Sequence, residues 1–288
     1  MLLNDAKLPG ALRLIRPANS VMMGFAVLIG AVLASRKAIE GESWLKLSLG
    51  FATGFALTAA SMVFNDYFDR EVDAVNQPGR PIPSGLVTPR EAALWGVLWT
   101  ILGFATACAT GPATLVTAAA AWLMFTSYAV GGKRTGLPGN LLVSGCVVTP
   151  FFYGALLLNS TVGVNTWLFA AMAFLSNTGR EVTKGIPDAV GDRAGGVKTI
   201  AVRYGAKVAA AGSSGLYTAA VLLSPIPWVL GTVSALYLPL VAAADAGFIS
   251  SSVSLLRDPS PSNSHRVKSR VLIWMLLGLV AFLLGGVN

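Results

Sequence analysis

The chain has 288 residues, of which 54% are hydrophobic and only 12% are charged, and its mean hydropathy is +0.66. Soluble domains carry about 25% charged residues, so the composition excludes an ordinary soluble protein and predicts one that crosses a membrane several times. The net charge of +8 fits the basic cytoplasmic loops of such a protein. No stripe of aromatic and basic residues indicates a nucleic-acid partner.

Nine apolar segments follow one another along the chain, each close to the roughly 20 residues that a helix needs to span the hydrocarbon layer. Lipid offers the backbone no hydrogen-bond partners, so we expect each segment to be a helix. No polar domain lies between them, which predicts a single transmembrane domain over residues 1–288, an all-α bundle of nine membrane helices. The segments cover residues 18–34, 47–64, 93–109, 113–130, 141–158, 161–177, 208–223, 227–249 and 271–287.

Lysine and arginine are unevenly shared between the loops that join these segments. The N-terminal tail, with Lys7, and the even-numbered loops hold most of them, whereas the odd-numbered loops hold Arg36, Lys37 and Lys46. Basic residues concentrate on the cytoplasmic side of membrane proteins. We therefore expect a multi-pass protein of the cell membrane with its N-terminus and even-numbered loops in the cytoplasm and its C-terminus outside. No cleavable signal peptide is expected, because no clear small-residue cleavage site precedes or interrupts the first segment.

A first acidic cluster follows directly on the second apolar segment. If that helix continues past Phe64, Asp66, Asp69 and Asp73 fall on one face at i, i+3 and i+7, and Asn65 joins them. Carboxylates at the mouth of a membrane helix are costly unless a cation lies among them. Oxygen ligands suit Mg²⁺, which keeps some waters and takes further ligands from phosphate. The cluster therefore indicates a phosphorylated substrate.

A second acidic cluster lies in the sixth loop, just past another even-numbered segment. Asp188 and Asp192 are four residues apart and can share a helical face. Both clusters fall on the side of the membrane that the basic loops predict to be cytoplasmic. We expect their acidic ends to face one another across a cavity.

Taken together, the two clusters resemble the UbiA superfamily of intramembrane prenyltransferases. The family pattern Asn-Asp-x-x-Asp-x-x-x-Asp is matched in the first cluster, and its Asp-x-x-x-Asp pattern is matched in the second. The resemblance implies a helical bundle around a central cavity open sideways to lipid, where two Mg²⁺ ions hold a polyprenyl diphosphate. The metal ligands that it implies are Asn65, Asp66, Asp69, Asp73, Asp188 and Asp192, all of which except Asp73 we also assign to catalysis.

Two positions depart from the family pattern. Many members carry an acidic residue where this chain has Gly185, and many carry a glutamate where it has Val190. These departures leave open which other ligands complete the second metal site.

Basic residues must complete the site, since carboxylates and a diphosphate carry more negative charge than two divalent ions balance. The residues that we expect to bind the substrate phosphates are Arg16, Arg80, Lys133, Arg134 and Lys184. Tyr128, just before the basic loop, is a candidate for the junction between donor and acceptor. Ordinary anchoring of tyrosine at the membrane interface explains its place equally well.

Three functions stay open. Asn76, Arg80 and Ser84-Gly85, with Gly179 to Gly185 and Thr199, resemble the family branch that prenylates the hydroxyl of geranylgeranylglyceryl phosphate in ether-lipid synthesis. The branch of quinone synthesis, which prenylates an aromatic acceptor such as 4-hydroxybenzoate or a naphthoate, shares the aspartate motifs. A transporter should instead place ionisable groups near the midplane of several helices. We expect no obligatory protein partner.

A few polar residues have simpler expected roles. Arg70 and Glu71 fit the solvated end of a helix with ordinary ion pairs, such as one between Asp69 and Arg70. Asp245, late in the eighth segment, is expected to be hydrogen-bonded or to reach toward the interface. Residues 257–262 are predicted to be a loop, and Cys108 and Cys146 are expected to be buried thiols without a disulfide.

Overall fold

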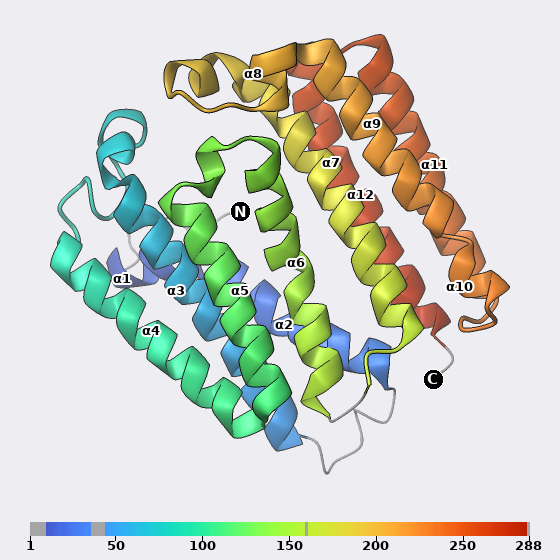
Figure 1. The fold of residues 1–288 in the computed structure, drawn as a ribbon, viewed down its shortest axis with the longest axis horizontal. Helices are drawn as coiled ribbons and strands as arrows, with labels where there is room; N and C mark the ends of the chain where they lie inside the picture. The colour runs from blue at the N-terminus through green and yellow to red at the C-terminus, as the bar shows by residue number, and fades with distance from the viewer. Residues whose placement is uncertain (1–9, 36–43, 159–160, 287–288) are drawn as a thin grey trace, which may run out of the picture. The chain divides into compact units, whose positions relative to one another are not determined.

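The computed structural model describes residues 10–35, 44–158 and 161–286, and Figure 1 shows that this part of the chain is helical. Within these ranges the extended pairing is limited to one isolated bridge between Val233 and Gly286. The predicted all-α class is therefore confirmed. The helices are α1 Gly10–Ile15, α2 Pro17–Ala34, α3 Trp44–Asn76, α4 Pro89–Thr110, α5 Pro112–Val130, η4 Gly132–Arg134, α6 Leu137–Leu157, α7 Val164–Ala194, α8 Ile200–Tyr204, α9 Ala206–Leu223, α10 Ile226–Val229, α11 Tyr237–Arg257 and α12 Pro261–Gly285.

Eight of the described helices are long and apolar enough to cross a membrane, namely α2 to α6, α9, α11 and α12. The first half of α7 coincides with the predicted sixth segment, but the helix continues through charged residues to Ala194 and so falls outside this group. Eight of the nine predicted segments thus each overlap one helix, the eighth is divided between α10 and α11, and the chain is a multi-pass membrane protein. Among the basic residues of the predicted topology, Lys7, Arg36 and Lys37 lie outside the described residues, as does the C-terminal Asn288.

The described helices form two compact units, and the division falls at Pro150 inside α6. The first unit holds α1, most of α2, α3 to α5 and the last part of α6. The second holds the start of α6 and the helices from α7 to α12. The expectation of a single domain stays a prediction.

Small residues let the helices of the first unit pack with their backbones in contact. A Cβ on Gly30 would meet the backbone of Phe151, and one on Gly154 would meet the backbone of α2. Such close approach is the usual way that membrane helices associate. Next to Gly154 in the sequence, Tyr153 is buried, and its hydroxyl hydrogen-bonds with Thr110 at 2.8 Å and donates to Thr53 at 3.1 Å. These two bonds join α3, α4 and α6.

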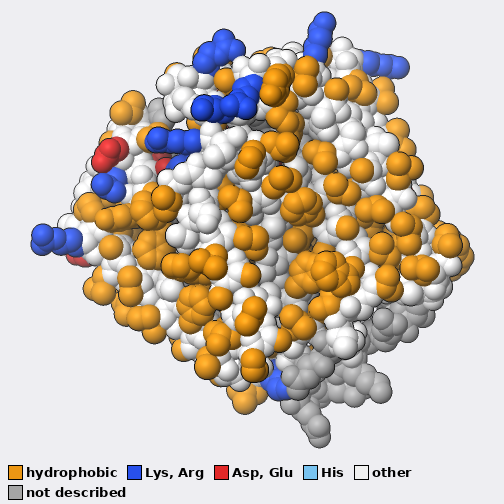
Figure 2. Space-filling model, viewed as in Figure 1, with side chains coloured by type: hydrophobic (Ala, Val, Ile, Leu, Met, Phe, Trp, Pro, Cys, Tyr) orange, Lys and Arg blue, Asp and Glu red, His pale blue; other side chains and the backbone are white. Residues whose placement is uncertain are grey.

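Tyr217 fixes the rotation of α7 in the second unit. Its ring lies against Gly179, where a Cβ would come within 2.7 Å of the ring, and its hydroxyl hydrogen-bonds with Thr183 at 2.9 Å. Because Tyr217 is fully buried, this contact holds one side of α7 against α9. Basic side chains gather at the end of this unit where α8 lies, and hydrophobic side chains cover the flanks of the helices (Figure 2).

Three expectations outside the site need correction. The eighth apolar segment is not continuous, because α10 ends at Val229 and α11 begins at Tyr237. The predicted loop at 257–262 is shorter, since Ser260 caps α12 with its side chain and Pro261 starts the helix. Cys108 is exposed, although both cysteines are free as expected.

Asp245 lies in the first half of α11, further from the end of the helix than its place in a longer segment suggested. Its carboxylate accepts a hydrogen bond of 2.6 Å from Ser224. The expectation of a hydrogen-bonded side chain is therefore confirmed.

Candidate functional site

The first acidic cluster lies on one uninterrupted helix. α3 runs from Trp44 to Asn76 without a break at Phe64, so the spacing of the acidic residues becomes a helical face as predicted. Asp66 is 3% exposed and Asp73 is 6% exposed, which places two carboxylates almost out of contact with solvent. A buried carboxylate is stable as an anion only with a charged or hydrogen-bonding partner beside it.

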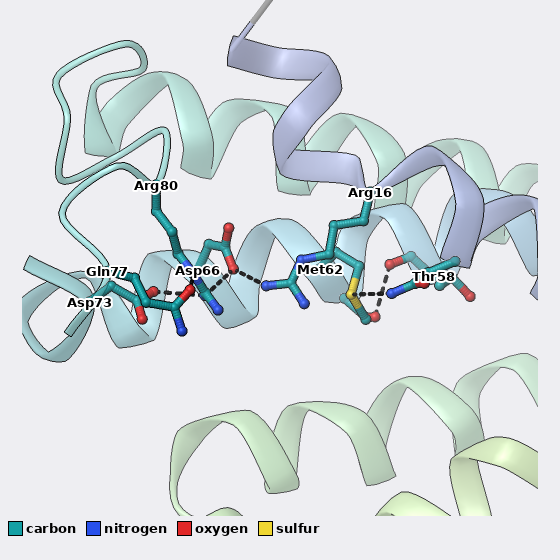
Figure 3. A network of polar contacts seen from close by, with 9 residues as sticks. Arg16, Thr58, Met62, Asp66, Asp73, Gln77 and Arg80 are labelled. Atoms are coloured by element: carbon teal, nitrogen blue, oxygen red, sulfur yellow. Dashed lines mark hydrogen bonds and ion pairs between the residues drawn. The ribbon is translucent and has the colours of Figure 1, made fainter. Parts of the chain in front are cut away.

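Two arginines supply that partner, as Figure 3 shows. The Nη1 atom of Arg80 donates to Asp66 Oδ1 at 2.9 Å and to Asp73 Oδ2 at 2.8 Å. The Nη2 atom of Arg16 donates to the same Asp66 oxygen at 2.6 Å. Charge-assisted hydrogen bonds of this kind are about twice as strong as neutral ones, and here they join three separate segments of the chain.

The loop after α3 is folded so that Arg80 reaches back to the helix. Hydrogen bonds from Arg80 N to Gln77 O and from Ser84 N to Arg80 O close successive turns, and Arg80 Nε donates to Gln77 Oε1 at 2.9 Å. Ile82 and Val87 are buried in a cluster with residues of α1 and anchor the loop. The segment that begins at Arg80 and continues Pro-x-Pro-Ser-Gly is therefore folded so that it holds the Arg80 guanidinium against α3.

Arg16 is positioned by the sharp joint between α1 and α2. Its φ of 44° is the one left-handed value at a non-glycine residue in the described part of the chain. That conformation costs roughly 1 kcal/mol at a residue with a Cβ, so the surrounding structure must hold it. Hydrogen bonds from Asn19 N and Ser20 N to Arg16 O start α2 directly after the joint.

The other expected residues of the first unit lie on α3 and α5. Asn65 and Asp69 are half-buried on α3, and Tyr128 is half-buried in the last turn of α5. Arg70 pairs with Glu71 at 3.3 Å and lies 5.0 Å from the centre of the Tyr67 ring. This exposed pair fits the solvated helix end expected of Arg70 and Glu71.

The second cluster lies on the charged half of α7. By helical periodicity Glu181, Asp188 and Asp192 share a face. Asp188 is exposed and Asp192 is half-buried. Burial raises the pKa of Asp192 above its usual value, and the Asp188 carboxylate raises it further, while Lys184 and a hydrogen bond with Thr199 lower it. Such a pair of neighbouring carboxylates is stabilised by any cation placed between them.

Glu181 is the site residue that the sequence reasoning did not select. Its side chain is 12% exposed and pairs with Arg180 at 3.0 Å and with Lys184 at 3.5 Å. The spacing of i+3 to Lys184 and i+7 to Asp188 was the signal that could have identified it. In the structure Glu181 orients Lys184, one of the expected phosphate-binding residues.

The basic turn before α6 is hydrogen-bonded to the loop after α7, and we call this backbone contact the clasp. Lys133 and Arg134 lie in η4, and the backbone N–H of Lys198 donates to the Arg134 carbonyl at 3.1 Å. Gly136 has a φ of +79°, and the Lys198 carbonyl oxygen occupies the space that a Cβ would need. This clasp holds two expected phosphate-binding residues beside the loop that leads from Asp192.

The acidic residues of each unit could bind a metal ion that also takes ligands from a substrate phosphate. Among the described side chains, no three His, Cys, Asp or Glu residues come close enough together to form a metal site by themselves. Mg²⁺ is commonly held by one or two carboxylates together with substrate phosphates and waters. Asp66 with Asp73, and Asp188 with Asp192, fit that mode of binding.

Comparison with known proteins gives the sequence relationships. The UbiA prenyltransferase family matches residues 23–284, a range that spans both units. A digeranylgeranylglyceryl phosphate synthase from Methanopyrus kandleri is 35% identical over 272 residues, which are 94% of this chain and 97% of the relative. The synthase of the same name from Methanothermobacter thermautotrophicus is 31% identical over 278 residues, or 95% of each chain.

Solved structures show the same fold. A structure of a digeranylgeranylglyceryl phosphate synthase superposes with a TM-score of 0.86 at 30% identity and covers 97% of this chain and 98% of that one. A UbiA homologue from Archaeoglobus fulgidus, solved with GPP and Mg²⁺, has a TM-score of 0.69 at 18% identity, with 95% of this chain and 99% of that chain covered.

The ion pairs of Arg80 lead to a stability prediction. Breaking a fully buried ion pair costs about 3–5 kcal/mol, and Arg80 keeps some contact with solvent, so we expect Arg80→Gln to lower the free energy of unfolding by about 2–3 kcal/mol. Denaturation of the purified protein in detergent measures this change.

Arg70→Gln is the matched control for Arg80→Gln, since Arg70 pairs with a Glu71 side chain that is 85% exposed. Exposed pairs of this kind contribute less than about 1 kcal/mol. Equal losses of stability in the two variants would contradict the role assigned to Arg80.

Proposed function

This chain belongs to the UbiA prenyltransferase family, and from that premise we propose that it is a digeranylgeranylglyceryl phosphate synthase. It transfers a geranylgeranyl group from geranylgeranyl diphosphate to the hydroxyl of geranylgeranylglyceryl phosphate. The observation that carries the proposal is the near full-length similarity, at 31% and 35% identity, to two archaeal synthases of that name. The residues of α3 and α7 supply the chemistry that such a transfer needs.

The difficult step is the departure of diphosphate from the allylic carbon. Negative charge grows on the leaving oxygens as the C–O bond breaks, so cations fixed around them lower the barrier. When bound, Mg²⁺ would act as a Lewis acid on those oxygens, and we propose two ions, one for each acidic cluster. Asp66, Asp69 and Asp73, with Asn65, would hold one ion, and Asp188 with Asp192 would hold the other.

The arginines of the first unit have a second task in this proposal. Arg16 and Arg80 neutralise Asp66 and Asp73 at distances of 2.6 to 2.9 Å. A diphosphate that enters with its metal ions offers the carboxylates another cation and offers the guanidiniums another anion. The two arginines would then turn to the phosphate oxygens, where their planar groups bind well.

Basic residues of the second unit complete the phosphate site. Lys133 and Arg134 are fixed by the clasp on the Lys198 backbone, and Lys184 is oriented by Glu181. An acceptor with its own phosphate needs more positive charge than an aromatic acceptor, which favours the ether-lipid branch. Tyr128, at the end of α5, would line the junction between the two substrates.

The proposal requires the acidic ends of the two units to meet at one chamber on the cytoplasmic side of the cell membrane. The distribution of basic loops supports this orientation. The phosphate ends of both substrates would then enter from that side, while their prenyl chains stay among apolar helix walls.

Labelling of single cysteines tests the orientation. In a variant that lacks Cys108 and Cys146, we expect Val229→Cys, at an exposed position of α10, to react with a membrane-impermeant maleimide on intact cells. Ser262→Cys, at the start of α12, should react only after the membrane is opened. The reverse pattern would contradict the proposed topology.

A product assay tests the choice of acceptor. With labelled geranylgeranyl diphosphate and Mg²⁺, we expect the purified protein to prenylate geranylgeranylglyceryl phosphate at least 100-fold faster than 4-hydroxybenzoate, because a site built to pair with a charged group rejects analogues that lack it. Faster turnover of the aromatic acceptor would move the chain to the quinone branch. Ion flux in liposomes without prenyl transfer would favour a transporter.

The carboxylates can be tested one unit at a time. We expect Asp66→Asn and Asp192→Asn each to lower kcat/KM by about 100-fold or more, since each removes charge from one metal site. Asp258→Asn is the matched control, because Asp258 is an exposed aspartate in the loop before α12 and should leave the rate unchanged. Full activity of wild-type protein in excess chelator would contradict the metal mechanism.

A further inference from the structure

The second unit brings several helix ends together at the place where α8 lies. Leu255, in the last turn of α11, belongs to one buried cluster with Ala209 in the first turn of α9 and Ala201 of α8. The start of α12 is tied to the same place, because the side-chain amide of Asn263 donates to the Ser254 carbonyl at 3.1 Å. Exposed residues of α8, of the start of α9, of the end of α11 and of the start of α12 therefore lie at one end of this unit.

Five exposed basic residues lie on these helix ends, and we call them the basic end of the second unit. They are Arg203, Lys207, Arg257, Arg266 and Arg270. None of the five forms an ion pair or a side-chain hydrogen bond with another described residue. In the first unit, by contrast, Arg16, Arg70 and Arg80 each pair with a carboxylate. The second unit thus leaves positive charge unbalanced at the end where Figure 2 shows blue side chains.

The positions of these cations make them costly without an outside partner. Arg266 and Arg270 are four residues apart on α12, where like charges on a helix repel one another. Lys207 lies in the first turn of α9, and neither α9 nor α12 has an acidic residue in its first turn. The N-terminal end of a helix carries partial positive charge and favours anions. An external anion would relieve both kinds of repulsion.

Exposed apolar side chains lie among these cations. Tyr204, Val208 and Leu256 are each next in sequence to a residue of the basic end, and they are 63%, 50% and 55% exposed. Basic residues mixed with tyrosine and aliphatic side chains are typical of protein surfaces at the boundary between lipid headgroups and acyl chains. A soluble acidic partner would pair with the cations alone, so the pattern favours a lipid surface.

We propose that the basic end of the second unit binds the phosphate headgroups of anionic phospholipids in the membrane leaflet that it meets. α9, α11 and α12 are long and apolar enough to cross the membrane, which brings their ends to the level of the headgroups. Arginine binds phosphate oxygens through parallel N–H bonds, and the exposed apolar neighbours enter the adjoining acyl region. The inference does not rest on the proposed function, because it uses no residue of the acidic clusters or of the phosphate site.

The experiment uses full-length protein in nanodiscs whose lipid is varied from phosphatidylcholine to phosphatidylglycerol. In a variant that lacks Cys108 and Cys146, Ser269→Cys carries an environment-sensitive fluorophore on exposed α12 surface beside Arg270. We expect the fluorescence to respond to phosphatidylglycerol and to saturate well before it becomes the main lipid, because each basic residue near an anionic surface strengthens binding about fivefold. Salt at about 1 M should abolish the response, since it screens charges beyond roughly 3 Å.

Charge-removing variants locate the response. Arg266→Gln combined with Arg270→Gln should raise the half-saturating fraction of phosphatidylglycerol by about fivefold or more. Arg203→Gln combined with Lys207→Gln should shift it in the same direction, because this pair lies on the neighbouring helices of the same end. All four side chains are exposed, so the variants keep the buried packing of the unit.

Arg70→Gln combined with Arg90→Gln is the matched control, since it removes two cations from α3 and α4 of the first unit. The half-saturating fraction should stay within about twofold of the unmodified value. An equal shift in this control would mean that the fluorophore reports net charge, and it would overturn the inference. Equal responses of the unmodified protein to the two lipids would also overturn it.

Poly-glutamate added to pure phosphatidylcholine discs tests the other occupant. A response to this acidic polypeptide, without one to phosphatidylglycerol, would assign the basic end to a soluble acidic partner and contradict lipid binding. No step of the assay needs prenyl transfer, so failure of the lipid inference would leave the proposed function standing, and loss of prenyl transfer would leave the lipid response unchanged.

Discussion

Asp66 and Asp73 are nearly buried on a helix whose apolar part lies in the membrane, and their pairing with arginine is the interaction on which the first half of the site depends. Both carboxylates are nearly excluded from solvent, and each accepts from Arg80 at 2.8 to 2.9 Å. A buried charge without a partner is strongly destabilising. The sharp joint at Arg16 and the tight loop around Arg80 are therefore parts of the site, because they bring guanidinium groups to carboxylates that could not otherwise be buried.

The second half of the site meets the same requirement in a different way. Asp188 and Lys184, one and two turns before Asp192 on α7, are the charged groups that act on its carboxylate, and among the described residues Asp192 forms no ion pair with an arginine. Tyr217 against Gly179 sets the rotation of α7, and the clasp at Gly136 holds the basic turn. A diphosphate with its divalent cations would supply the positive charge that this face lacks. Arg16 and Arg80 thus balance charge in the first cluster within the chain, and the proposed function places a metal ion at each cluster.

Sequence was sufficient for the helices and for the acidic faces, because lipid forces apolar segments into helices and helical periodicity then places Asp66, Asp69 and Asp73 together. The family assignment from the two motifs is confirmed. What sequence could not reveal depends on contacts between distant segments. The break between α10 and α11 goes with a hydrogen bond between Thr232 and Asn165, and the close approach of Gly185 to Thr199 becomes visible only in the folded chain. The meeting of the two acidic clusters stays a prediction for the same reason.

That meeting is the central claim, and a structure of the protein with Mn²⁺ and pyrophosphate tests it most directly. Anomalous scattering distinguishes the Mn²⁺ ions from lighter atoms such as oxygen. The account predicts two Mn²⁺ peaks on one pyrophosphate, one beside Asp66 and one beside Asp192. Ions bound to pyrophosphate at only one cluster, with the other cluster turned toward solvent or protein, would contradict it.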